Sequence, residues 1–156
     1  MDKVQLVGGT ESDRQKVLEK HAIYIAANGK MDWETLRDQL WSDASEGTFF
    51  NLNGHTYKGR EPWIELWKYY TKNLQTGDWT PFDMGGVINE DLAVVWCHRN
   101  THIKWVGGEN RADGKMHDDK EFHSRSTMVF RKEKDDWRVI HVHFSEFNEG
   151  PRPGGI

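Results

Sequence analysis

The sequence predicts an α+β domain in which a curved antiparallel sheet wraps around helices that come first along the chain. Apolar residues recur at helical spacing up to about residue 75, and they alternate as in strands after that point. Helices followed by strands in hairpin order are typical of this class. No linker, repeat or low-complexity block interrupts the body, so we expect one domain over residues 1–149 and a flexible tail over 150–156.

Three helices are expected in the first half. Ser12 or Asp13 can cap a first helix that ends at Asn28-Gly29, and Asp32 can cap a second, shorter one. Pro62 suits the first turn of a third helix, where its missing N–H costs no hydrogen bond. Aromatic and apolar residues recur on one side of these helices: His21, Tyr24, Trp33, Leu36, Trp41, Trp63, Trp67 and Tyr70.

A hairpin and three long strands are expected next. Residues 48–52 and 55–57 flank Asn53-Gly54, a dipeptide typical of tight hairpin turns. The glycine pairs 85–86 and 107–108 are interpreted as turns or bulges, and the second opens a polar loop over 107–114. The long strands are predicted over 92–105, 121–131 and 137–145.

Composition excludes several classes of function. The net charge of −4 and the pI near 6.1 give no basic surplus, so no nucleic-acid partner is expected. No apolar stretch has the length of a membrane span, and the N-terminus lacks the form of a signal peptide. A single cysteine, Cys97, leaves no internal disulfide, so we expect a cytoplasmic protein. Eight tryptophans predict a large aromatic core or an aromatic-lined cavity.

The last strand carries two imidazoles. Side chains alternate along a strand, so His141 and His143 share a face with Trp137 and Val139. Buried ring nitrogens need partners, water or a ligand. Because an imidazole both takes and gives a proton near neutral pH, this pair is a candidate for acid–base catalysis. The alternative is that the two histidines only tie the sheet together.

A family resemblance rests on three stretches. Arg125-Ser-Thr127-Met-Val129 followed by residues 137–145, the segment 54–60, and Asp91-Leu-Ala-Val-Val resemble, in this order, the SnoaL-like, nuclear-transport-factor-2-like (ketosteroid-isomerase-like) superfamily. The chain is especially similar to the branch that contains the association domain of the calcium/calmodulin-dependent kinase, over roughly residues 12–147. The resemblance implies a cone-shaped, cystatin-like α+β barrel. It also implies a homodimer or higher oligomer, with a pocket between the concave sheet face and the helices.

The resemblance also places side chains. It puts the row of Arg125 and the row of His141 on the concave wall, and Arg99 at the position of a pocket arginine. The catalytic candidates are then His141, His143, Arg125 and Arg99. The substrate-binding candidates are Tyr24, Trp33, Trp41, Trp67, His123, Thr127 and Trp137.

Two functions from different classes remain open. Isomerases and dehydratases of the superfamily commonly use a pocket aspartate, which the predicted concave rows lack, so histidine becomes the expected base. The first hypothesis is a cofactor-independent lyase, dehydratase or isomerase acting on a small aromatic or cyclic, lignin-derived or polyketide-like compound, with arginine stabilising an oxyanion. The alternative is a non-catalytic ligand-binding or oligomerisation module.

No cofactor and no metal are expected. His98 and His102 lie about 13 Å apart on a strand, too far for one ion, and His141 and His143 would need a third ligand such as His123 or His21. The face of His98 and His102 is interpreted as a dimer interface or as solvent-exposed.

Overall fold

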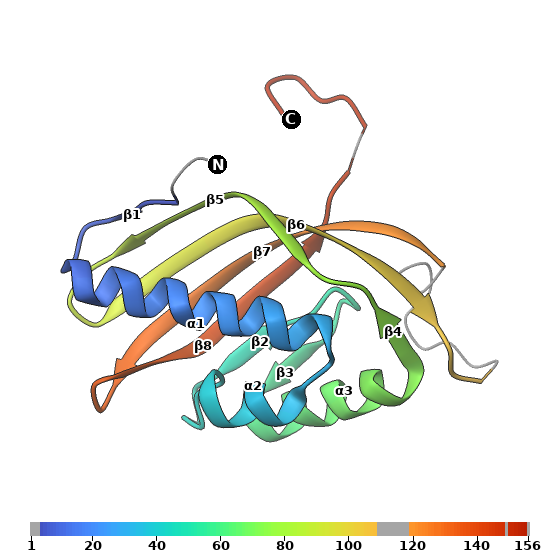
Figure 1. The fold of residues 1–156 in the computed structure, drawn as a ribbon, viewed down its shortest axis with the longest axis horizontal. Coiled ribbons are helices and arrows are strands. Elements are labelled where there is room, and N and C mark those ends of the chain that lie inside the picture. The colour runs from blue at the N-terminus through green and yellow to red at the C-terminus, as the bar shows by residue number, and fades with distance from the viewer. Residues whose placement is uncertain (1–3, 109–118, 149, 156) are drawn as a thin grey trace.

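The computed structural model describes residues 4–108, 119–148 and 150–155. Most of the predicted polar loop, and the predicted boundary at residue 149, therefore lie outside the described residues. In Figure 1, helix α1 (Glu11–Gly29) crosses one face of a long curved sheet, and α2 (Trp33–Gln39) and α3 (Arg60–Asn73) pack near its end. The predicted α+β class, with a curved sheet around N-terminal helices, is confirmed.

The helix starts follow local hydrogen bonding. Thr10, rather than Ser12 or Asp13, caps α1, because its hydroxyl oxygen accepts from the Asp13 backbone N–H at 3.1 Å. The predicted cap of α2 is confirmed, since Asp32 accepts from the Thr35 N–H at 3.1 Å. Helix α3 begins after Gly59, with Pro62 in its first turn.

The described strands form one mixed sheet that does not close into a barrel. Its order is β1-β5-β6-β7-β8-β2-β3, and β4 pairs with β6. Most neighbouring strands are antiparallel, as predicted, but β1 with β5 and β2 with β8 are parallel pairs, so the sheet is mixed. The strands are β1 (Leu6–Val7), β2 (Thr48–Phe50), β3 (Thr56–Lys58), β4 (Leu74–Thr76), β5 (Thr80–Ile88), β6 (Leu92–Trp105), β7 (Lys120–Glu133) and β8 (Asp136–Glu146).

Strand β5 was not among the predicted strands. It contains Pro81 and Gly85-Gly86, residues that argue against a strand when only the sequence is considered. The register with β6 shifts between Phe82 and Gly85, so the prediction of a bulge near this glycine pair is confirmed. Pairing on both sides, with β1 and β6, holds the segment extended despite its composition.

A second bulge decides which side chains of β8 face the helices. Val139 pairs with Phe130, and His141 pairs with the adjacent Val129, so Ile140 is an extra residue in β8. One extra residue reverses the side-chain alternation beyond it. Trp137 and Val139 therefore point into the core, as do the later residues Val142 and Phe144, while the histidines between them turn to the opposite face.

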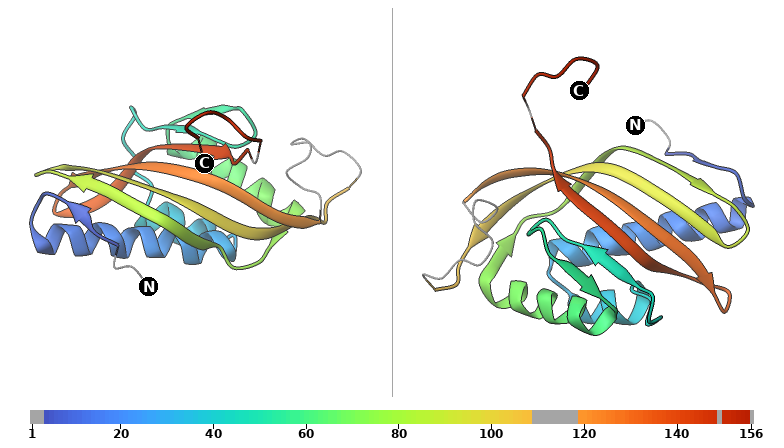
Figure 2. Two further views of the ribbon diagram at one scale, coloured as in Figure 1. Left: turned by 90° about the horizontal axis from the view of Figure 1, so that it is seen from above. Right: turned by 180° about the vertical axis from the view of Figure 1, so that it is seen from behind.

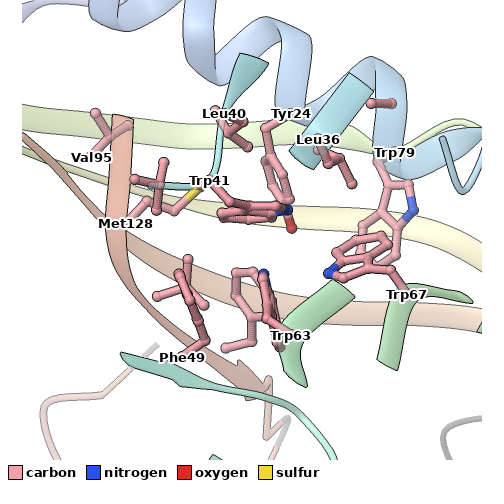
Figure 3. Packing of buried hydrophobic residues seen from close by; sticks show 14 of the residues in the cluster. Tyr24, Leu36, Leu40, Trp41, Phe49, Trp63, Trp67, Trp79, Val95 and Met128 are labelled. Atoms are coloured by element: carbon pink, nitrogen blue, oxygen red, sulfur yellow. The ribbon is translucent and has the colours of Figure 1, made fainter. Parts of the chain in front are cut away.

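The core lies between the helices and the concave face of the sheet. We call this face, which α1 covers in Figures 1 and 2, the inner face, and the opposite one the outer face. Figure 3 shows the aromatic centre of the core, with Trp67 and Trp79 together at one end of it. Fully buried members include Tyr24, Trp41, Trp63, Trp137, Phe49 and Phe130. None of the described helices is long and apolar enough to cross a membrane.

Candidate active site

Arg99 is the central feature of the inner face. It lies in the middle of β6, is only 1% exposed, and faces the same side as the buried residues Cys97 and Thr101. A cavity of about 40 Å³ lies beside it, between the sheet and helices α1 and α3. The cavity is lined by Tyr24, Asn28, Met31, Asn51, Leu52, Trp67, Tyr70, Leu74, Trp79, Arg99, Ile103 and Phe144.

The guanidinium is held by neutral groups. Its Nε donates to the Ser124 hydroxyl at 2.9 Å, and Nη1 donates to the Tyr24 hydroxyl. Aromatic rings stack on it, with its central carbon 4.1 Å from the centroid of Phe144 and 4.6 Å from that of Trp79. Such cation–π contacts are stronger in a desolvated setting than at the surface. The arginine is thus fixed in one orientation.

No carboxylate neutralises this charge within the described part of the chain. The cavity lining contains none, and burial alone lowers the pKa of Arg99 to about 9. The group therefore remains a cation at neutral pH. A buried charge without a counterion is costly, unless an anionic ligand supplies the counterion. The site is built to receive negative charge.

His21 is the buried imidazole of the inner face. It projects from α1, is 2% exposed, and its Nε2 lies 3.8 Å from the Sγ of Cys97, which in turn lies 3.3 Å from the Ser126 hydroxyl. Burial and, secondarily, the charge of Arg99 lower the pKa of His21 from 6.5 to about 4. His21 is accordingly neutral at pH 7 and able to accept a proton. Burial also raises the pKa of the Cys97 thiol.

Two further donors lie at the cavity without acceptors. The indole nitrogens of Trp67 and Trp79 are buried, and neither has a hydrogen-bond partner among the described residues. A buried donor without an acceptor costs about 1–3 kcal/mol. Together with Arg99, they give the cavity lining one cation and two donors without acceptors among the described residues. A ligand with several acceptor oxygens would correct this imbalance.

The structure brings three of the predicted site residues to this cavity: Arg99, Tyr24 and Trp67. Three others lie elsewhere on the helix side of the molecule. Trp41 packs within the aromatic core, Trp137 donates its indole N–H to Asp13 at 3.2 Å, and Trp33 lies between Arg37 and Lys68.

The remaining predicted residues lie on the outer face, so their predicted placement on the concave wall is wrong. His141 and His143 turn outward because of the bulge at Ile140, and both rings pack edge-on against Phe50. His141 also bonds through Nδ1 to the Thr48 carbonyl at 2.7 Å. Three more predicted site residues lie on this face. Arg125 and Thr127 are exposed, and His123 has its Nε2 2.9 Å from Nδ1 of His98.

The register of β6 with β7 explains why the row of Arg125 lies on the outer face rather than on the predicted concave wall. Arg99 pairs with Ser124, so the odd positions of β6 share a face with the even positions of β7. The sequence does carry a signal for this, since the even row of β7 is apolar or small and the odd row is polar. His21 likewise falls in a helical stripe with Val17, Tyr24 and Asn28. Trp79 has no such signal.

No group of histidine, cysteine and acidic side chains suited to a metal ion occurs in the described ranges. His98 and His123 approach each other, but a third ligand does not converge on them there. His102 lies apart, with Nε2 at 3.2 Å from Asp119, near the end of β6.

A family model places these observations in context. The model of the SnoaL-like domain matches residues 17–148. The chain belongs to the SnoaL-like family. This confirms the resemblance seen in the sequence, and the matched span includes His21, Tyr24 and Arg99. No curated protein sequence matches the chain.

Solved structures of the same fold cover nearly the whole SnoaL-like chain. A nuclear transport factor 2-like superfamily protein of Salmonella enterica has a TM-score of 0.75 at 17% identity, covering 95% of this chain and 100% of that one. A putative dehydratase of the same family from Streptomyces avermitilis has a TM-score of 0.68 at 20% identity, with coverages of 89% and 99%. The association domain of the Caenorhabditis elegans calcium/calmodulin-dependent kinase II has a TM-score of 0.59 at 20% identity, with coverages of 86% and 96%.

Proposed function

We propose that this protein is a cofactor-independent lyase, dehydratase or isomerase that acts on a small aromatic or cyclic compound. The observation that carries the proposal is the buried Arg99, a fixed cation without a counterion in the described residues, beside a neutral buried histidine. Preorganised charge of this kind stabilises oxyanions far better in a dry site than in water. The arrangement is suited to a reaction that passes through an enolate or a phenolate.

Arg99 and Tyr24 supply the oxyanion stabilisation. The guanidinium already donates to Tyr24, so the phenol hydrogen is available to donate in turn to a ligand oxygen. Both groups line the same cavity. Negative charge that develops on a substrate oxygen there would be met by a cation and a neutral donor, neither of which needs to reorganise.

His21 is the proposed base, in place of the outward-facing His141 and His143. It would take a proton from a carbon adjacent to the bound oxygen, and the electrons of that C–H bond would pass into the enolate held by Arg99. Return of the proton to another carbon gives isomerisation, and its delivery to a leaving hydroxyl gives elimination of water. Burial is the main cause of the low pKa of His21 and the charge of Arg99 the second, and an anion bound at Arg99 offsets this second cause. Substrate binding would thus make the base stronger.

The second candidate is a non-catalytic ligand-binding or oligomerisation module. It is favoured by the likeness to a kinase association domain, whose name describes assembly rather than turnover. As a ligand-binding module, the protein would use the Arg99 cavity for an anion just as the enzyme would, but it would not convert the ligand.

A thermal-shift screen followed by a turnover assay tests the proposal. Aromatic carboxylates and phenols that bind the native state should raise the melting temperature. β-Hydroxy aryl propionates should then lose water to give cinnamates, which are detected by ultraviolet absorbance. Binding that requires Arg99 without any turnover would favour the module. If no tested anion stabilises the protein in an Arg99-dependent way, both candidates fail.

We propose in addition that the protein is a homodimer that pairs through the outer face. Trp96, 44% exposed, lies over Gly85 on this face, where a Cβ on the glycine would come within 3.0 Å of the indole nitrogen. Phe82 and Phe50 are also exposed there. Sedimentation should show a dimer, and Trp96→Glu should give a folded monomer. An unchanged dimer in this variant would exclude the face.

The free, buried thiol of Cys97 supports our proposal that the protein works in the cytoplasm. We propose neither a nucleic-acid nor a membrane partner.

A further inference from the structure

The Arg99 cavity is too small for the proposed substrate. Its volume of about 40 Å³ is far below the ~150 Å³ of a protein cavity that can hold a benzene ring. A carboxylate group fits such a space, whereas an aromatic ring does not. A ring compound bound at Arg99 therefore needs additional room next to the cavity.

That room exists on the other side of the Trp79 side chain. An apolar groove of about 470 Å³ runs between helix α1 and strand β5. It is lined by Val4, Leu18, His21, Ala22, Ile25, Ala26, Asp78, Trp79, Pro81 and Met84. Trp79 lines both the groove and the Arg99 cavity. Pro81 of the groove pairs directly with Arg99 in the sheet, so the two spaces are adjacent.

Trp79 is placed to open this partition. It follows Gly77-Asp78 in the short link between β4 and β5, and the link is anchored at Gly77, whose N–H donates to the His102 carbonyl at 2.9 Å. The indole itself stacks on Arg99, and its buried nitrogen has no hydrogen-bond partner among the described residues. Rotation of the ring outward would hydrate this N–H, which offsets part of the stacking that is lost.

We infer that Trp79 is a gate between the two spaces, and that the substrate is an aryl carboxylic acid whose carboxylate binds Arg99 and whose ring lies in the groove. This inference rests on the proposed function of the Arg99 cavity. Charge selects the carboxylate, because Arg99 is a cation without a counterion in the described ranges, and the apolar lining selects the ring. The groove alone is within the usual range for small-molecule sites, ~300–1,000 Å³. His21 lines the groove and lies next to Cys97, so the base would face the carbons nearest the carboxylate.

The acids naphthoate and acetate distinguish binding in the groove from binding in the cavity. Ala22 is exposed on α1 and lines the groove, so Ala22→Phe should fold and fill it. By calorimetry, we expect the naphthoate affinity to fall about tenfold and the acetate affinity to stay within about twofold. Lys16→Phe, at an exposed position of the same helix outside the groove lining, is the control and should change neither affinity.

Trp79→Ala tests the gate itself. Stopped-flow measurements of naphthoate fluorescence should show an association rate constant about tenfold above that of the native protein, because the partition is gone. Trp33→Ala removes a tryptophan that lines neither the cavity nor the groove and should leave the rate unchanged. If naphthoate binding requires Arg99 but neither Ala22→Phe nor Trp79→Ala alters it, the inference is overturned and the proposed function stands. If neither acid binds through Arg99, both are overturned.

Discussion

The two faces of strands β6 to β8 carry the same kinds of side chain in opposite environments. The inner face has one arginine and, opposite it on α1, one histidine, Arg99 and His21, both buried. The outer face has Arg125 and His143, both exposed. Burial lowers the pKa of both His21 and Arg99. Arg99 also has no counterion among the described residues. Desolvation, rather than the number of histidines on a strand, therefore distinguishes the candidate active site.

The largest effect should come from substitution of Arg99, and the matched change at Arg125 should have almost none. Arg99→Met keeps an unbranched apolar stem but removes the guanidinium and its charge, and we expect carboxylate affinity and any turnover to fall at least about a hundredfold. Arg125→Met, the matched change on the outer face, should alter both by less than about twofold. Because removal of an unpaired buried charge is often stabilising, the Arg99 variant should melt no lower than the native protein. Equal losses in the two variants would erase the distinction between the faces.

The next largest effect should come from substitution of His21. His21→Gln should lower kcat by about 10²-fold or more, since the proposed base is lost, and should change ligand affinity much less. His141→Gln and His143→Gln, one at a time, should each retain activity within about threefold. Steady-state kinetics on the dehydration assay measure all three. A larger loss in either outer-face variant would move the base back to β8.

The stability of the protein should depend on His21 in a defined pH range. Because its folded pKa, about 4, lies below the unfolded value of 6.5, the unfolded state binds more protons between these values. Stability is therefore fully present above about pH 6.5 and is lost as the pH falls towards 4, by roughly 3 kcal/mol at most. Urea unfolding at several pH values measures this loss, which His21→Gln should remove and His143→Gln should retain. A hydrogen bond from Lys132 lowers the pKa of Asp13 below 3.8, so its contribution fades only in more acid solution.

The smallest expected effect is the uptake of protons when the ligand binds. An anion at Arg99 reduces the repulsion that helps to lower the pKa of His21, so binding should be accompanied by proton uptake near pH 5. Naphthoate affinity should then rise a few-fold between about pH 7 and about pH 5. Calorimetry in buffers of different ionisation enthalpy detects the uptake directly. A pH-independent affinity would mean that His21 does not sense the ligand.

Much of the fold could be predicted from the sequence because local signals decide it. Asp32 caps its helix as predicted, and the long strand from Leu92 to Trp105 has the predicted bounds. Strand β5 was missed because its proline and glycines disfavour a strand locally, and only pairing with its neighbours keeps it extended.

The site was harder to predict than the fold. Arg99 and Tyr24 fall in the cavity as expected, whereas the rows of Arg125 and His141 were assigned to the wrong face. That assignment depends on the β6–β7 register and on one extra residue, Ile140, and a one-residue shift moves every later side chain to the opposite face. A bulge of this kind leaves no mark in the composition of the strand.

A crystal structure of the complex with naphthoate would decide where the carboxylate binds. We expect it within hydrogen-bond distance of the Arg99 guanidinium on the inner face, with the naphthalene ring in the groove beside His21. A carboxylate bound instead on the outer face, against His141 and His143, with Arg99 still enclosed by Tyr24, would contradict it.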